Sequence, residues 1–388
     1  MIHVSQDIIG STTDPITKEV AHIYRFTLVN DQTQMYVQIL SYGATIYSLR
    51  VADASGKLDD VVLGFDLLEE YEQPQNPYFG ATIGRVCNRI ANGSFFIYDK
   101  PVQVTKNRGN NHLHGGKIGF DKVPWDLKEI HVDGVTFAHR SLDGHEGYPG
   151  EVYATVRYTL TEDNALRIHM TAKTTMTTVV NMTNHSYFNL AGHNSGRKGL
   201  YEHNVAIFAE DITETDEESI PTGIFKPVVF TPYDFRTMEN LGKRIQALQP
   251  DKLGFDDNFC VPRIDLDANG VTPVARVIHP PTGRWMEVSS NQPGVQFYTS
   301  NYLPDEEKGE KPLIGRSNAR YCKHGAFCLE TQVYPDAPNH ANFPEIILRP
   351  GQIYEHIVNY KFGTCKKTAL EDAGSIGEGE GACGGPED

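Results

Sequence analysis

Polar side chains occur at several points where this sequence otherwise predicts a buried β-strand. The segment VVNMTNHSYFNLAG (179–192) begins with two valines and continues into amides, a hydroxyl and the imidazole of His185. Glu330 directly follows the apolar residues AFCL (326–329), and burying a carboxylate without partners is unfavourable. We therefore expect both segments to end in the wall of a polar ligand site.

Further polar residues have the same apolar surroundings. They are Asn88 and Arg89 in GRVCNRIANG, His112 and His114 in NNHLHGG, Asp256 and Asp257 in GFDDNF, and Gln296 in GVQFYTSN. Singly, each has a plainer explanation, such as a surface salt bridge for Arg89, a turn cap for His114 or a satisfied buried side chain for His185. Together they suit a polyhydroxylated ligand, because sugar hydroxyls both donate and accept hydrogen bonds. The two glycines after His114 would let the backbone approach that ligand, and Tyr187, Phe188 and Tyr298 would offer ring contacts.

A metal site is an alternative for part of this set. His112 and His114 would lie on one face of an extended segment, and a later Glu and His could complete a ligand set of the jelly-roll type. The segment is rich in Gly and Asn, however, which is more typical of a loop than of a strand. We predict no metal and no cofactor.

Composition excludes several classes of partner. The chain has 388 residues, a formal net charge of −15 and a pI near 5.4, which disfavours nucleic acid and anionic membranes as partners. It has no apolar run of about 18 residues, no signal-peptide pattern at its start, and six scattered cysteines without a CxxC motif. We expect a cytoplasmic protein with reduced thiols, acting as a monomer or weak homodimer on a small molecule.

Period-two alternation dominates the chain. Apolar and polar residues alternate over 22–30, 35–51, 151–160 and 165–173, with turns at 161–164 and 279–283, and 345–362 predicts two strands around Pro350-Gly351. Short helices are expected only at 66–73 and 238–249. This pattern predicts one all-β domain over 1–363, built as packed antiparallel sheets or a barrel, and a flexible acidic, Gly-rich tail over 364–388.

Six segments, in order and spacing, resemble the galactose mutarotases (aldose 1-epimerases). They are GRVCNRIANG, HLHGG with GFDK, TNHSYFNLAG, GFDDNF, QPGVQFYTSN, and FCLETQVYPDAPN with LRPG, and the similarity runs from about residue 15 to 362. The resemblance implies a large β-sandwich with an open cleft. It also implies a cytosolic, cofactor-free isomerase of galactose metabolism that interconverts the α and β anomers of galactose and glucose.

The resemblance also implies roles for individual residues. Glu330 matches the family's catalytic base and His185 its catalytic acid. The substrate-binding positions match Asn88, Arg89, His114, Asp256 and Gln296. Asp257 departs from a histidine found in a close relative and could alter hydroxyl recognition. The tail has no recognised counterpart.

Mutarotation needs one base for the C1 hydroxyl and one acid for the ring oxygen, which we expect on opposite sides of the reacting centre. The negative charges of Glu330 and Asp256 would favour the imidazolium form of His185. Three alternatives remain: a glycoside hydrolase, which also uses paired carboxylates; a non-catalytic sugar-binding protein; and a hexose-6-phosphate epimerase. A hexose-6-phosphate epimerase should need several cationic residues at the cleft to bind the phosphate, and the motifs supply only Arg89.

Overall fold

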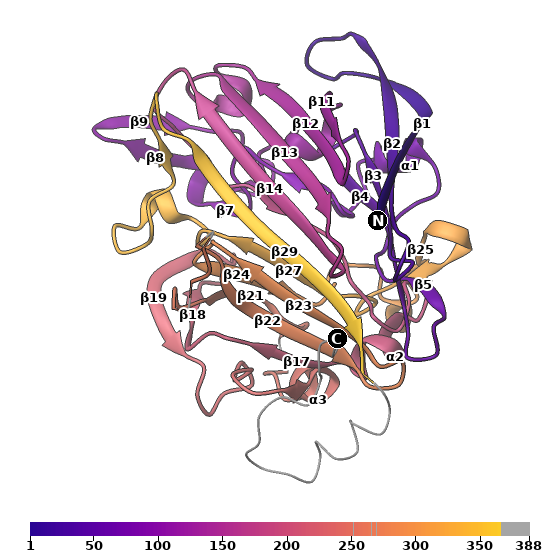
Figure 1. Cartoon of the computed structure of the whole chain (residues 1–388). Helices are drawn as coiled ribbons and strands as arrows, with labels where there is room; N and C mark the ends of the chain where they lie inside the picture. The colour runs from indigo at the N-terminus through magenta and orange to yellow at the C-terminus, as the bar shows by residue number, and fades with distance from the viewer. Residues whose placement is uncertain (251, 265, 269, 366–388) are drawn as a thin grey trace.

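Three antiparallel sheets contain most of the β-strands in a computed structural model, which describes residues 1–250, 252–264, 266–268 and 270–365 (Figure 1). In spatial order, the nine-stranded sheet contains β11 (Asp126–His131), β12 (Gly134–Ser141), β13 (Val152–Leu160), β14 (Ala165–Thr174), β29 (Tyr354–Thr364), β23 (Arg284–Ser290), β22 (Thr272–His279), β17 (Asn204–Ile207) and β20 (Glu239–Asn240). A five-stranded sheet contains β19 (Pro221–Pro227), β18 (Asp211–Thr215), β21 (Asp256–Cys260), β24 (Gly294–Tyr298) and β27 (Cys328–Gln332). The N-terminal sheet contains β1 (Ile2–Thr13), β2 (Val20–Asn30), β3 (Tyr36–Leu40), β4 (Thr45–Ala52) and β5 (Leu58–Asp60).

The remaining strands form short two-stranded ladders. They are β7 (Arg89–Ile90) with β10 (His112–Leu113), β6 (Thr82–Ile83) with β16 (Thr183–Asn184), β15 (Thr178–Val179) with β28 (Ile347–Leu348), β8 (Ser94–Ile97) with β9 (Lys100–Gln103), and β25 (Leu313–Ile314) with β26 (Arg320–Tyr321). The α-helices of the described residues are α1 (Leu68–Tyr71), α2 (Gly196–Tyr201) and α3 (Leu241–Gln246). The predicted all-β sandwich with few short helices is confirmed.

The alternating segments form the central strands. In β13, Val152, Ala154 and Val156 are fully buried, whereas the residues between them are partly or fully exposed. The predicted turns at 161–164 and 279–283 join β13 to β14 and β22 to β23. Period two therefore located these strands correctly, because one face of the sheet packs on the core and the other meets water.

Several other predicted strands and helices differ from the observed ones in length or pairing. The segment 35–51 is two strands, because Gly43 (φ 63°) and Ala44 (φ 42°) turn the chain so that β3 and β4 pair with each other. The helices predicted over 66–73 and 238–249 shrink to α1 and α3, and α2 was not predicted. The strands around Pro350-Gly351 exist, but β28 pairs with β15 and β29 with β14 and β23, so they do not form a hairpin.

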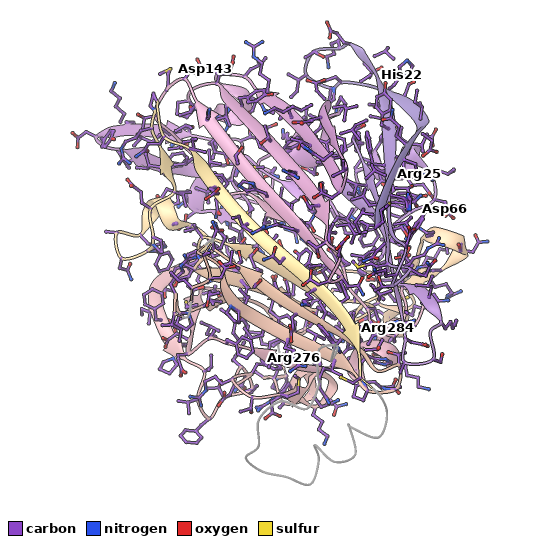
Figure 2. All side chains as sticks on the ribbon, in the orientation of Figure 1. His22, Arg25, Asp66, Asp143, Arg276 and Arg284 are labelled. Carbon is purple, nitrogen blue, oxygen red and sulfur yellow. The ribbon has the colours of Figure 1, made fainter. Side chains whose placement is uncertain are left out.

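One hydrophobic cluster contains residues from all three large sheets, among them Val37, Val156 and Phe297. Arg284, at the start of β23, ties the nine-stranded sheet to its neighbours: its buried guanidinium donates to the carbonyl oxygens of Val51, Lys57 and Leu190 (Figure 2). A buried cation needs such partners, so this contact fixes how the layers meet.

The chain's end differs in detail from the prediction. β29 continues to Thr364 and Cys365 is buried, so the described structure passes the expected boundary at 363. The remainder of the predicted tail, 366–388, lies outside the described residues. Among the residues that the structure does describe, no helix has the length and apolar character needed to cross a membrane.

Candidate active site

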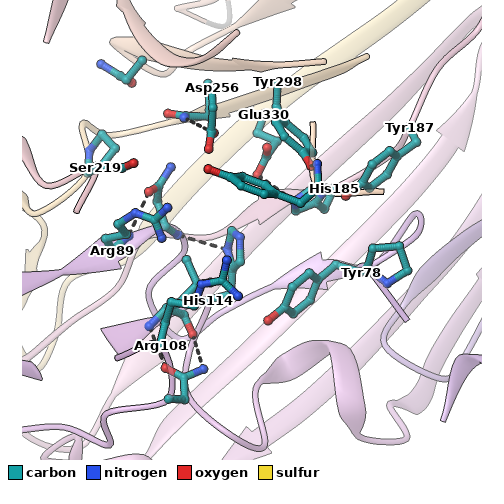
Figure 3. Close-up of a pocket in the computed structure, with 18 of the residues that line it drawn as sticks. Tyr78, Arg89, Arg108, His114, His185, Tyr187, Ser219, Asp256, Tyr298 and Glu330 are labelled. Carbon is teal, nitrogen blue, oxygen red and sulfur yellow. Dashed lines mark hydrogen bonds and ion pairs between the residues drawn. The ribbon is translucent and has the colours of Figure 1, made fainter. Parts of the chain in front are cut away.

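A cavity of about 320 Å³ brings together residues that lie far apart in the sequence (Figure 3). It is lined by all seven residues predicted to act in catalysis or substrate binding: Asn88, Arg89, His114, His185, Asp256, Gln296 and Glu330. They come from five places in the fold, namely the β7–β10 ladder, the segment after β16, and the strands β21, β24 and β27.

One wall is the face of the five-stranded sheet. The ladder register sets Gln296 on β24 directly opposite Glu330 on β27, and residues directly opposite one another share a face. Gln296 Nε2 donates to Asp256 Oδ1 at 2.9 Å. Burial raises the pKa of Asp256, partly offset by the charge of Arg89.

Asp257, whose effect on hydroxyl recognition stays a prediction, does not line this wall. Successive residues of a strand face opposite sides, and Asp257 is buried beside the cavity's lining and not part of it. Its carboxylate accepts the backbone N–H of Asp256 at 3.0 Å, and its nearest cation is Lys252, 4.0 Å away. Burial raises the pKa of Asp257 to about 6.

The facing wall depends on a pair of hydrogen bonds between Asn88 and His114. The His114 N–H donates to Asn88 O at 3.0 Å, and the Asn88 N–H donates to His114 Nδ1 at 3.1 Å. Both residues have positive φ, 59° and 49°. Since a backbone N–H can only donate, Nδ1 of His114 must be an acceptor, and its single proton sits on Nε2. Burial, with the nearby His185 and Arg89, lowers the pKa of His114 well below its usual value, so His114 is a neutral donor.

The glycines after His114 have another role than the predicted one. A Cβ on Gly115 would lie 1.9 Å from the carbonyl oxygen of Gly84, and one on Gly116 would lie 2.2 Å from the Glu146 carboxylate. Both have positive φ. They allow close packing of the chain against itself, not approach to a ligand.

The polar residues of the segment after β15 mainly make hydrogen bonds to neighbouring backbone. Asn181 exchanges hydrogen bonds with both backbone groups of Val333, and Thr183 Oγ1 donates to the carbonyl of Thr331. Asn184 donates to Gly80 O. The bonds of Asn181 and Thr183 fasten the segment to the end of β27, and that of Asn184 fastens it to the chain just before β6. Of its amides, hydroxyls and imidazole only His185 lines the cavity.

His185 lies beside Glu330, with Nε2 and Oε2 3.6 Å apart. Its ring is stacked between those of Tyr78 and Tyr187, with centroids 5.7 and 5.1 Å away, and its Nδ1 is 3.7 Å from Cys328 Sγ. The two groups are side by side on one wall, so the prediction that they flank the reacting centre from opposite sides is wrong.

The protonation states also differ from the prediction. Burial lowers the pKa of His185 to about 3. Burial, together with the charge of Asp256, raises the pKa of Glu330 well above its usual range. Desolvation outweighs the neighbouring negative charges at His185, so burial favours a neutral imidazole and a neutral carboxyl, not the expected imidazolium.

His114, His185 and Glu330 also have the spacing of a metal site, with potential ligand atoms within 4.8 Å of one another. The His114 tautomer argues against that use, because Nε2 carries a proton and has no lone pair to offer. His112 is no alternative ligand: Nδ1 contacts Thr105 O and Nε2 the Tyr148 hydroxyl, each at 2.6 Å. The donor set therefore suits hydrogen bonding to hydroxyls better than metal ligation.

The cavity has further lining residues that the motifs did not identify. They include Tyr78, Arg108, Lys122, Thr213, Asn258 and Tyr302. Asn258 could have been found, since it stands two residues after Asp256 on the same strand face. Tyr187 and Tyr298 line the cavity as expected, but Phe188 is fully buried in the core. Arg108 and Lys122 add to Arg89 the positive charge at the cleft that a hexose-6-phosphate epimerase would need.

The chain is similar to known proteins over most of its length. The family model described as aldose 1-epimerase matches residues 24–361. Galactose mutarotase of Bos taurus is 46% identical over 340 residues, covering 88% of this chain and 94% of that protein. Aldose 1-epimerase of Escherichia coli K12 is 34% identical over 343 residues, covering 87% of this chain and 95% of that protein. Among solved structures, an aldose epimerase homologue from C. elegans superposes with a TM-score of 0.78 at 28% identity, covering 87% of this chain and 98% of that one. This chain is a member of the aldose 1-epimerase family.

Proposed function

We propose that this protein interconverts the α and β anomers of free aldohexoses, galactose and glucose among them, with Glu330 and His185 as the proton-transfer pair. The observation that carries the proposal is their 3.6 Å separation inside one polar cavity. Glu330 Oε2 is buried and has no hydrogen-bond partner among the described residues, so a substrate hydroxyl can take that place. The C1 hydroxyl and the ring oxygen are bonded to the same carbon, which suits adjacent acid and base groups.

The reaction needs one proton on the pair. Glu330 accepts the proton of the C1 hydroxyl, His185 delivers a proton to the ring oxygen, and the bond between C1 and the ring oxygen breaks. Rotation about C1–C2 in the open-chain aldehyde and reversal of both transfers give the other anomer. Burial favours the neutral forms of both groups, and hydrogen bonds from sugar hydroxyls to Glu330 would stabilise its anion and favour transfer of the proton to His185.

The other lining residues hold the sugar. The Nε2–H of His114 donates to the ring oxygen or an adjacent hydroxyl, and Arg89 and Asn88 bind from the same wall. Asp256 and Gln296, already joined by a hydrogen bond, take hydroxyls away from C1. The ring is thereby fixed while C1 remains able to turn.

Replacing Glu330 by Gln tests the proposal, since the amide keeps the shape and removes the base. Polarimetry on freshly dissolved α-D-galactose should show turnover lowered by at least about 10²-fold. Glu355→Gln is the matched control, because Glu355 is an exposed carboxylate paired with His169 on the outer face of the nine-stranded sheet. Near-normal turnover of Glu330→Gln would refute the assignment.

Substrate panels separate the alternatives. A glycoside hydrolase would release nitrophenol from a nitrophenyl galactoside, and a sugar-binding protein would bind galactose without speeding anomer exchange. Arg108 and Lys122 make glucose 6-phosphate worth including, but Glu217 and Glu218 line the recess next to Arg108. We expect free hexoses to be turned over faster than the phosphate ester, because those carboxylates repel it.

We further infer a monomer or weak homodimer in the cytoplasm that binds neither nucleic acid nor membrane. The acidic net charge supports the absence of nucleic acid and membrane binding, and the free thiols of Cys87, Cys260, Cys322 and Cys328 support the cytoplasmic location. Sedimentation at several protein concentrations measures the assembly state.

A further inference from the structure

Four polar side chains form a row across the five-stranded sheet, two of them outside the predicted site. The register sets Gln296 on β24 opposite Glu330 on β27, and Asn258 on β21 opposite Gln296. Continuing the β18–β21 register by one residue places Thr213 opposite Asn258. The strands β18, β21, β24 and β27 lie side by side (Figure 1), and all four residues line the cavity.

Every member of this row has an unpaired buried polar atom. Among the described residues no hydrogen-bond partner reaches Thr213 Oγ1, Gln296 Oε1, Glu330 Oε2 or either amide atom of Asn258. Thr213 is 1% and Asn258 2% exposed. A buried polar group left unpaired costs about 1–3 kcal/mol, so five such atoms in one row indicate that something else pairs them.

Asn258 is held in place without using its polar atoms. Its Oδ1 rests against Gly294, where a Cβ would lie 2.7 Å from that oxygen and 2.9 Å from the Tyr334 ring. The missing side chain at position 294 thus makes room for the amide. An amide fixed by packing, with both donor and acceptor unused, is suited to a hydroxyl group, which needs one of each.

We infer that Asn258, with Thr213 beside it, is a further sugar-recognition residue that binds the hydroxyl at C3 or C4. Neighbouring strands are about 4.8 Å apart, so Asn258 stands about 10 Å along the row from Glu330. That span matches a pyranose ring with a hydrogen bond at each end. With C1 at Glu330, Asn258 meets the far end of the ring. This inference rests on the proposed function, because Glu330 sets the position of C1.

The test compares Asn258→Ala with the unaltered protein on galactose, 3-deoxygalactose and 4-deoxygalactose, using NMR exchange spectroscopy to measure anomer exchange at equilibrium. We expect kcat/KM for galactose to fall about 5- to 100-fold, mostly through KM. For one of the deoxy sugars the variant and the unaltered protein should differ by less than about 2-fold, because the partner hydroxyl is already missing. Asn359→Ala is the control, since that amide bonds to Ser289 on the nine-stranded sheet.

An equal loss on all three sugars, or no loss on galactose, would overturn the inference. If Asn258→Ala does not fold, Asn258→Ser, which keeps a donor and an acceptor on a shorter side chain, is run through the same three sugars and must show the same selective loss. The outcome is separable from the proposed function: an active Glu330→Gln variant contradicts the proton-transfer pair, whereas an unselective Asn258 variant beside an inactive Glu330→Gln variant contradicts this inference alone.

Discussion

The hydrogen bond from the Asn88 N–H to His114 Nδ1 predicts that two substitutions of one histidine will separate folding from catalysis. In His114→Asn, Oδ1 replaces Nδ1 as the acceptor, and Asn tolerates the positive φ of 49° at this position. In His114→Ala, the buried Asn88 N–H loses its partner, which costs about 1–3 kcal/mol of unfolding free energy. Both variants lose the Nε2–H that, in the proposed mechanism, donates to the sugar.

The expected results follow from that difference. Urea unfolding should show His114→Asn within about 0.5 kcal/mol of the unaltered protein and His114→Ala lower by about 1–3 kcal/mol. Polarimetry should show both reduced about 10²-fold in kcat, the usual effect of removing one positioned donor. The control is His22→Asn, since His22 is exposed on β2 (Figure 2) and does not line the cavity.

Two outcomes would refute the reasoning separately. If His114→Asn is as unstable as His114→Ala, the Nδ1 acceptor is not what holds the β7–β10 wall, and the tautomer is wrong. If His114→Asn keeps near-normal kcat, the Nε2–H does not contribute to the reaction.

Two further predictions concern charge and pH. Asp256→Asn keeps the acceptor for Gln296 but removes the charge, so KM should rise about 10-fold while kcat falls less; a larger fall in kcat than rise in KM would place Asp256 in the proton transfer. Burial lowers the pKa of His203 to about 3, whereas the unfolded value is about 6.5. The contribution of His203 to the free energy of unfolding is therefore fully present above pH 6.5 and is lost as pH falls toward 3. From pH 7 to pH 5 the loss amounts to about 2 kcal/mol of unfolding free energy. His203→Gln keeps an acceptor for the Leu190 N–H but does not titrate, so urea unfolding of this variant should show a correspondingly smaller loss over that range. Identical pH dependence in the variant would contradict the assignment.

The sequence was informative about the fold wherever burial on one side governs residue choice. β13 and β14 were located to within one residue because their alternation records which face meets the core. β1 was missed, since as an edge strand it is mostly exposed and has no such alternation. The break between β3 and β4 depends on backbone angles at Gly43 and Ala44, which periodicity does not record.

For the site, the sequence by itself determined which chemical groups are present, and the order of six segments was enough to name seven residues that do share one cavity. Only the tertiary structure decided how those groups behave. The pKa values of Glu330 and His185 depend on burial among residues distant in the chain. The His114 tautomer depends on the backbone of Asn88, and the alignment of Glu330, Gln296 and Asn258 in one row depends on strand register. Desolvation, tautomer choice and cross-strand alignment are properties of neighbours in space, and a linear sequence states only neighbours along the chain.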